Sequence, residues 1–314
     1  MYLVRGVRLV RQNVHFSSNG DTIAGTLFLP ENDGPSCALI LCHGAMDFKE
    51  HYFEFCEFLA SRGIAALAID MRGNGESQGA RFHVEIDQWV ADIVSALDFL
   101  DAHPQTSGVK TGAFGLSSGG TAVLECAVVE PRIEALVTLD ATVRTILSLP
   151  ETIQMQSLLL LGWIKRFLTK KELRLSMVDV FKNIPVTADP EINRRWREDP
   201  RVIEMWSSWP IPGAKESIIV DTIKRVPRIT APTLVLHGSE DRIDPPETAH
   251  LLFAALTCEK DIRIIEGNGH VGHMDRNKQE VMNLTADWAI RHLAGDRVRY
   301  QKEDSQDQSI GLSE

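Results

Sequence analysis

The sequence predicts an α/β protein built on a mostly parallel, doubly wound sheet. Short uninterrupted apolar runs, such as Cys37–Cys42 and Ile64–Ile69, are typical of strands that are buried on both faces of a sheet. Segments with helical spacing of apolar residues separate these runs, so that strand and helix alternate along the chain. The 314 residues, 44% hydrophobic and 24% charged, suffice for one large α/β domain or two small ones.

The chain opens with a predicted β-hairpin. Residues 7–16 and 22–29 alternate in polarity, and the turn-forming stretch Ser17-Ser18-Asn19-Gly20-Asp21 joins them. A polar loop over 30–35 leads into the first buried strand. The predicted elements that follow are the strand 37–42, a helix over 52–61, the strand 64–69, a helix over 84–100, a strand over 109–114, a helix over 121–127 and a strand over 133–139.

The alternation stops between residues 141 and 228. This segment contains helical patterns over 153–167, 173–181 and 192–206, and no alternation of strand and helix. It also holds four of the six tryptophans: Trp163, Trp196, Trp206 and Trp209. We interpret 141–228 as an inserted helical subdomain.

The sheet resumes after the insertion. A strand over 233–236, a helix over 246–256, a strand over 261–265 and an amphipathic helix over 278–293 complete the pattern. The polar tail 296–314 is expected to be disordered. The expected domains are therefore a core made of 1–140 and 229–295, the insertion 141–228, and this tail.

Charge and cysteine content exclude several classes of protein. The net charge of −10 argues against nucleic-acid binding, which favours a basic surface. The five scattered cysteines form no C-x-x-C pair, so neither a disulfide framework nor a zinc site is expected.

The hydrophobic runs predict no stable membrane insertion. No N-terminal signal segment is evident, so a cytoplasmic location is expected. The apolar run 158–164 is too short to span a bilayer, and we expect its leucines to pack on the body of the domain rather than on a membrane or a partner. The oligomeric state stays open, with a homodimer as one option.

One pentapeptide, Gly115-Leu116-Ser117-Ser118-Gly119, carries a candidate nucleophile. It follows a predicted strand and precedes a predicted helix, which is the context of the G-x-S-x-G nucleophile elbow. The glycines leave room for backbone that crosses close to so sharp a turn. The helix N-terminus behind Ser117 favours developing negative charge.

A serine hydroxyl needs a base, and the base needs a carboxylate that orients it. The chain order Ser, acid, His favours Asp241, in the loop after a predicted strand, as the acid. Glu240, Asp244 and Asp140 are competing acids.

The base is predicted to be His270. It lies between the last predicted strand and the last helix, and small residues flank it in Gly267-Asn268-Gly269-His270-Val271-Gly272. His273 is the rival. The same segment matches G-x-G-x-x-G, but only one helix and a polar tail follow it, so no dinucleotide fold can be completed and no cofactor is expected.

Two backbone amides are expected to stabilise the oxyanion of a tetrahedral intermediate. One belongs to Ser118, directly after the nucleophile. The other is expected in the loop after strand 37–42, where His43-Gly44 leads into Ala45. Ala45 is the favoured donor and Met46 the rival.

Taken together, these motifs resemble the α/β-hydrolase superfamily. They are His43-Gly44, Asp70-Met71-Arg72-Gly73-Asn74-Gly75-Glu76-Ser77, the elbow, His237-Gly238 with Asp241, and Gly269-His270, in the order of the superfamily. The run 42–77 is most similar to the feruloyl-esterase and serine-aminopeptidase-like group. The resemblance implies that 141–228 is a cap over the site, where the substrate is selected.

The expected function is that of a serine hydrolase acting on a carboxylic ester or a related small acyl compound through an acyl-enzyme. Two alternatives stay open with the same residues: cleavage of a carbon–carbon bond, or a thioesterase or acyltransferase. A third alternative, of another class, is a non-catalytic ligand-binding module. The tryptophans of the insertion either line an aromatic or acyl pocket or pack within the insertion.

Overall fold

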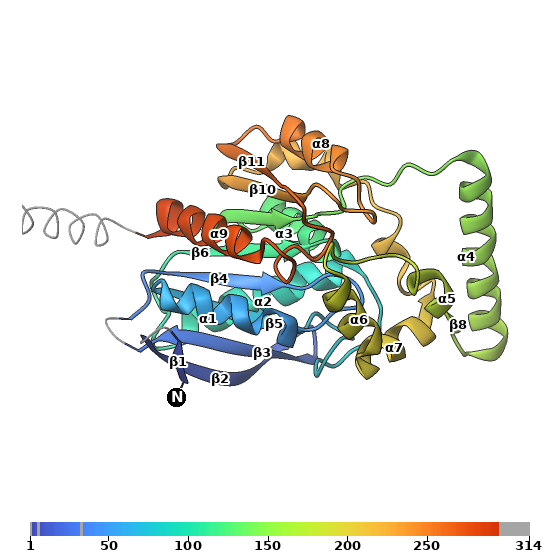
Figure 1. Cartoon of the computed structure of the whole chain (residues 1–314). Helices are drawn as coiled ribbons and strands as arrows, with labels where there is room; N and C mark the ends of the chain where they lie inside the picture. Colours follow the sequence, from blue (N-terminus) through green and yellow to red (C-terminus); the bar gives the residue numbers. More distant parts are fainter. Residues whose placement is uncertain (1, 5–6, 32–33, 295–314) are drawn as a thin grey trace, which may run out of the picture.

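The computed structural model describes residues 2–4, 7–31 and 34–294. In this part of the chain nine strands form one sheet, in the order β1-β2-β3-β5-β4-β6-β7-β10-β11 (Figure 1). The strands are β1 (Tyr2–Val4), β2 (Val7–Ser18), β3 (Asp21–Pro30), β4 (Cys37–Cys42), β5 (Ile64–Ile69), β6 (Thr111–Leu116), β7 (Ile133–Leu139), β10 (Thr233–Gly238) and β11 (Lys260–Ile265).

The sheet is antiparallel at its N-terminal edge and parallel elsewhere. β2 and β3 form the predicted hairpin, and Asn19 and Gly20 make its turn with positive φ of 47° and 88°. From β5 through β11 every neighbouring pair runs parallel. The carboxyl ends of these strands therefore meet at one edge of the sheet.

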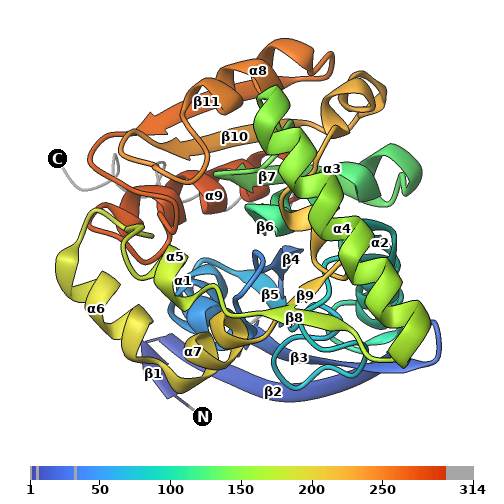
Figure 2. The same ribbon diagram turned by 90° about the vertical axis from the view of Figure 1, so that its right-hand side faces the viewer.

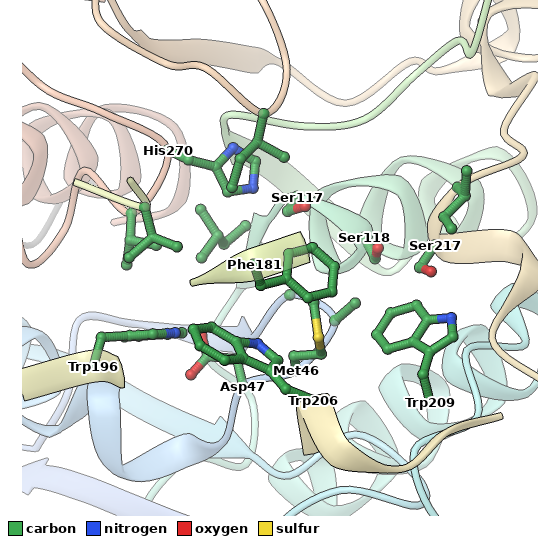
Figure 3. Close-up of a pocket in the computed structure, with 17 residues that line it drawn as sticks. Met46, Asp47, Ser117, Ser118, Phe181, Trp196, Trp206, Trp209, Ser217 and His270 are labelled. Atoms are coloured by element: carbon green, nitrogen blue, oxygen red, sulfur yellow. The ribbon is translucent and has the colours of Figure 1, made fainter. Parts of the chain in front are cut away.

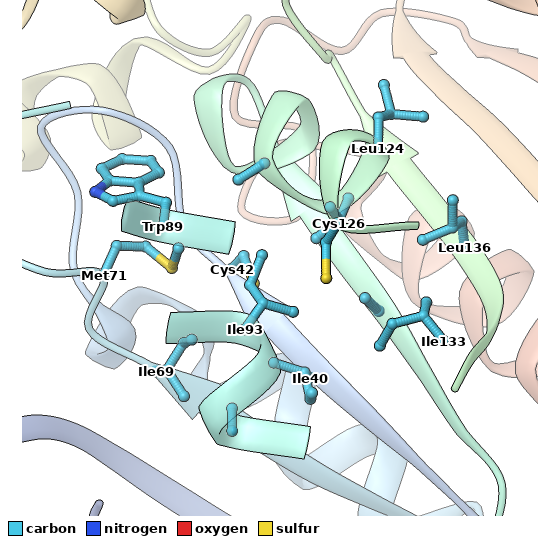
Figure 4. Packing of buried hydrophobic residues seen from close by; sticks show 14 of the residues in the cluster. Ile40, Cys42, Ile69, Met71, Trp89, Ile93, Leu124, Cys126, Ile133 and Leu136 are labelled. Carbon is cyan, nitrogen blue, oxygen red and sulfur yellow. The ribbon is translucent and has the colours of Figure 1, made fainter. Parts of the chain in front are cut away.

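Helices cover both faces of the sheet, as predicted. One face carries α2 (Ile86–Ala102), α3 (Ser118–Val129) and α8 (Glu247–Ala255), and the other carries α1 (Phe53–Ser61) and α9 (Lys278–Leu293) (Figures 1 and 2). Figure 4 shows the first face, where side chains of α2 and α3 pack on the strands. Each large apolar side chain so buried stabilises the fold by about 1.5–3 kcal/mol.

The segment between β7 and β10 lies across the edge where the parallel strands end (Figure 2). Its α-helices and strands are α4 (Leu149–Thr169), β8 (Leu173–Leu175), α5 (Val178–Phe181), α6 (Pro190–Glu198), α7 (Pro200–Ser207) and β9 (Trp209–Ile211). Three 3-10 helices follow them: η2 (Lys215–Ser217), η3 (Thr222–Lys224) and η4 (Val226–Arg228). Elsewhere in the chain, a further 3-10 helix, η1 (Lys49–Tyr52), directly precedes α1.

Two expectations about this segment are wrong. It is not purely helical, because β8 pairs with β9 in a two-stranded antiparallel sheet, and the helix predicted over 173–181 begins only at Val178. A pairing between residues 34 or more positions apart overrides the local helical pattern. The helix predicted over 192–206 is interrupted at Asp199, because a residue before proline disfavours the helical conformation, and Asp199 caps the next helix instead.

Two other expectations concern the ends and the hydrophobic runs of the chain. The tail 296–314 lies outside the described residues. Among the helices that the structure describes, none is both long enough and apolar enough to cross a membrane.

Candidate active site

Ser117 occupies a strained backbone position between β6 and α3. Its φ and ψ are 52° and −120°, outside the regions that non-glycine residues prefer, which costs on the order of 1–3 kcal/mol. The flanking glycines make the turn feasible: a Cβ on Gly115 would lie 2.3 Å from the Gly119 carbonyl oxygen, and one on Gly119 would lie 2.4 Å from the His43 carbonyl oxygen. Strain of this kind points to a functional residue.

His270 and Asp241 meet beside this turn. His270 Nδ1 lies 2.7 Å from Asp241 Oδ2, and both residues are buried. The other carboxylate oxygen, Oδ1, accepts hydrogen bonds from the amides of Ile243 (2.8 Å) and Asp244 (3.1 Å). These two amides fix the orientation of the carboxylate, so the site presents one oxygen to the histidine.

The carboxylates around His270 shift its pKa upward. Burial alone would lower the pKa of the imidazole, but Asp241, with Asp244 and Asp140 further away, raises it to about 9. Burial likewise opposes ionisation of Asp241, yet His270 and His237 hold its pKa well below the ordinary value. Asp241 therefore stays ionised beside His270.

Asp140, the rival acid, lies close by but makes different contacts. Its Oδ1 accepts the Gly238 amide at 2.8 Å, and within the described residues its Oδ2 has no hydrogen-bond partner. Complete burial, together with the charge of Asp241, raises its pKa. The structure thus places Asp241, and not Asp140, in hydrogen-bond contact with His270. Of the other competing acids, Asp244 accepts a hydrogen bond from Thr142 at 2.6 Å.

His237 is a second histidine beside the carboxylate of Asp241. Its Nε2 lies 2.9 Å from the Asp244 carbonyl oxygen, which only accepts, so Nε2 carries the hydrogen. The same nitrogen lies 3.3 Å from Asp241 Oδ2. This second histidine helps to keep Asp241 in place. The His237-Gly238 motif supported the family resemblance, but no role for His237 was predicted from it.

The loop after β4 passes close to Ser117: a Cβ on Gly44 would lie 3.2 Å from Ser117 Cβ. His43 Nε2 accepts the Met71 amide at 2.9 Å, so its Nδ1 carries the hydrogen and donates to the Gly44 carbonyl oxygen at 2.6 Å. In a trans peptide the carbonyl and the next N–H point in opposite directions. The N–H of Ala45 therefore points away from the His43 ring.

Ser117 opens into an apolar cavity of about 170 Å³ (Figure 3). His270, Ala45 and Ser118 line the same cavity. The insertion contributes most of the aromatic lining, and Figure 3 shows these rings on the side of the cavity opposite His270: Phe181, Trp196, Trp206 and Trp209. Trp163 does not line the cavity and is 56% exposed.

A second, more polar depression of about 490 Å³ adjoins the first and shares Ser117 with it. Ser217, Ile218 and Ile243 border both spaces. The residues that add polarity to the second space are Thr142, Arg144, Thr145, Asp244, Glu247 and Thr248. Ser117 therefore lies between two compartments, of which the second has more polar and charged side chains in its wall.

In the part of the chain that the structure describes, two groups of side chains have the spacing of cation ligands. Asp140, His237 and Asp241 form one group, but the hydrogen bonds described above already hold the two latter residues. The other group, Glu50, Asp70 and Glu76, surrounds the Lys49 ammonium at 2.6–3.0 Å. Lys49 supplies the positive charge at that position.

The structure brings the predicted site residues together. Ser117, Ser118, Ala45 and His270 line one cavity, and Asp241 contacts His270. The rival base His273 lies elsewhere: it is buried, stacks on Tyr52 at 4.3 Å, and burial lowers its pKa to about 3.

This sheet, with a strained serine at a strand-to-helix turn, is the fold of an α/β hydrolase. A family model described as serine aminopeptidase, S33, matches residues 33–277. The chain belongs to this family, and the resemblance seen in the sequence is confirmed.

Individual relatives agree with this assignment. A monoacylglycerol lipase of Mycolicibacterium smegmatis is 22% identical over 277 residues, which cover 87% of this chain and 95% of the lipase. Esterase FrsA of Escherichia fergusonii is 30% identical over 141 residues, 44% of this chain and 33% of the esterase. The crystal structure of the α/β hydrolase GrgF from Penicillium sp. sh18 has the same fold, with a TM-score of 0.76 at 22% identity over 91% of this chain and all of that one.

Proposed function

We propose that the protein hydrolyses carboxylic esters of small acyl compounds, with Ser117 as the nucleophile. The observation that carries this proposal is the strained Ser117 in one cavity with a histidine whose Nδ1 contacts a buried, ionised carboxylate. Relatives named monoacylglycerol lipase and esterase support the same substrate class.

The proposed reaction has two halves. His270 Nε2 takes the hydroxyl proton while Ser117 Oγ bonds to the ester carbonyl carbon, and Asp241 stabilises the imidazolium. The tetrahedral intermediate collapses, the C–O bond to the alcohol breaks, and His270 returns the proton to the alcohol. Water then attacks the acyl-serine by the same route and releases the carboxylic acid.

The amides of Ser118 and Ala45 are the proposed oxyanion donors. Ser118 begins α3, so its N–H belongs to the helix N-terminus and points along the helix dipole. The hydrogen bond from His43 to Gly44 supports Ala45 as the second donor. Removing one such donor typically lowers kcat by about 10²–10³-fold.

We further propose that the segment 141–228 acts as a cap that selects the substrate. Its aromatic side chains line the apolar compartment, so the hydrocarbon part of an ester fits there and a polar part fits the adjoining depression. A screen of p-nitrophenyl esters of increasing chain length, with thioesters and 1,3-diketones alongside, tests both proposals. Turnover of medium-chain esters is expected; turnover of only thioesters or only diketones would assign the site to another reaction.

The activity is expected to rise with pH. His270 accepts a proton only when it is neutral, and its pKa is raised to about 9, so kcat/KM is low on the acid side and increases through an ionisation above 6.5. The pH profile of kcat/KM with a neutral ester measures this midpoint. A midpoint at or below 6.5 would contradict the assigned pair of His270 and Asp241.

A further inference from the structure

Helix α4 carries an extensive apolar surface that nothing in the described chain covers. Large side chains of α4, and that of Ile146 before it, are exposed to between 45% and 78% of their area. Hydrophobic side chains exposed singly are normal, but a contiguous set is not. The set comprises Ile146, Leu149, Ile153, Leu160, Leu161, Trp163, Ile164, Phe167 and Leu168.

The opposite face of α4 is firmly attached to the rest of the protein. Gly162 is buried, and a Cβ there would lie 2.7 Å from the Ile211 carbonyl oxygen of β9. Leu158 and Leu159 are partly buried against the core, as expected from the sequence, whereas Leu160 and Leu161 are exposed, contrary to that expectation. The exposed face therefore points outward, and Figures 1 and 2 show that α4 itself lies at the outside of the molecule.

The exposed side chains follow the spacing of a coiled-coil seam. The series that follows this spacing is Leu149, Ile153, Gln156, Leu160, Trp163 and Phe167. Successive members are separated by four and three residues in turn, and Gln156 is the one polar member. Alternation of four and three is the heptad pattern with which one helix packs along another. The pattern predicts a helical partner that lies lengthwise on α4.

The area of this surface is sufficient for a stable dimer. Nine large side chains exposed to this degree present on the order of 1,000 Å², since an aromatic side chain offers about 150–250 Å² when fully exposed and a leucine or isoleucine somewhat less. The largest apolar patch of a monomer is usually about 300–600 Å², and a stable interface buries about 800 Å² on each partner.

Charge decides the direction of the partner helix. In residues 149–171 the single acidic residue, Glu151, lies in the first turn, and the four basic residues lie near the C-terminal end: Lys165, Arg166, Lys170 and Lys171. Two parallel copies would place four cations against four cations. Two antiparallel copies separate these clusters and also align the helix dipoles favourably.

We propose that α4 binds the α4 of a second copy of this chain, as an antiparallel pair related by a two-fold axis. Such an isologous contact is self-complementary, because a contact from one residue of the first copy to a second residue of the other copy occurs again with the two copies exchanged. An anionic membrane is the less favoured occupant: the chain carries a net charge of −10, and the basic residues cluster at one end of α4 rather than along the length of its polar face.

Sedimentation velocity of the purified full chain tests the proposal. The wild type is expected to sediment with a mass near twice the 35.0 kDa of one chain at micromolar concentration. The double variant Leu160→Glu/Phe167→Glu is expected to weaken association about 100-fold or more, because two charges would be buried in each half of the seam. Val129→Glu is the matched control: Val129 is 55% exposed on α3, so this variant should remain dimeric.

Cross-linking tests the direction of the pair. In the antiparallel register Leu149 lies opposite Phe167 of the second copy. A mixture of Leu149→Cys and Phe167→Cys proteins, oxidised with copper phenanthroline, should therefore form the mixed disulfide, and each protein alone should not. The five native cysteines are buried or half-buried, which keeps the background low.

Three results would overturn the proposal. A wild type that stays monomeric up to high micromolar concentration contradicts it, as does a double variant that dimerises like the wild type. Disulfides in each cysteine variant alone would show a parallel pair. Binding of a monomeric wild type to vesicles of phosphatidylglycerol and phosphatidylcholine, lost in the double variant, would assign the α4 surface to a membrane instead.

Discussion

Replacement of Ser117 by alanine is expected to lower kcat for ester hydrolysis by about 10⁴-fold or more, while the protein stays folded. The reason is that no other group in the proposed reaction forms the covalent bond to the acyl carbon. The fold should persist because alanine bears the positive φ of 52° no worse than serine does. Steady-state kinetics and a thermal melt measure the two effects.

Ser118→Ala is the matched control for this experiment. Its side chain has no part in the proposed mechanism, and its backbone amide remains in alanine, so less than a tenfold change in kcat is expected. A fluorophosphonate probe should label the wild type and Ser118→Ala, but not Ser117→Ala. Full activity in Ser117→Ala would refute the nucleophile, and an unlabelled wild type would favour a non-catalytic binding module.

Replacement of Asp241 by asparagine is expected to lower kcat by about 10⁴-fold, and the structure explains why so similar a side chain fails. The amides of Ile243 and Asp244 donate to Oδ1, so the asparagine oxygen must occupy that position. Its NH₂ group then faces His270 Nδ1, which has to accept. The hydrogen of the neutral imidazole is thereby moved to Nε2, the atom that should take the proton of Ser117.

Asp140→Asn separates this mechanism from a general effect of removing buried charge. Asp140 is equally buried, yet it bonds the Gly238 amide and not His270, so less than a tenfold loss is expected. An asparagine also tolerates the positive φ of 51° at this position. If Asp140→Asn proved as damaging as Asp241→Asn, the role of the acid would move to Asp140.

Local patterns in the sequence predicted the sheet well. Cys37–Cys42, Ile64–Ile69 and Ile133–Leu139 match the structure residue for residue, because a strand buried on both faces is mainly apolar, and polar residues or a glycine at its ends mark its limits. The short strands β8 and β9 carry no such signal. They exist because they pair with each other, and that pairing depends on residues far apart in the chain.

The sequence by itself determined the fold class, the family and the candidates Ser117, Asp241 and His270, whose roles remain predictions. It could do so because a strained strand-to-helix turn demands glycines at fixed positions and the motifs occur in one order. Only the tertiary structure decided that Asp241 rather than Asp140 contacts His270, and that aromatic rings of the insertion meet Ser117. These are contacts between loops distant in the chain, and long-range packing alone sets their distances.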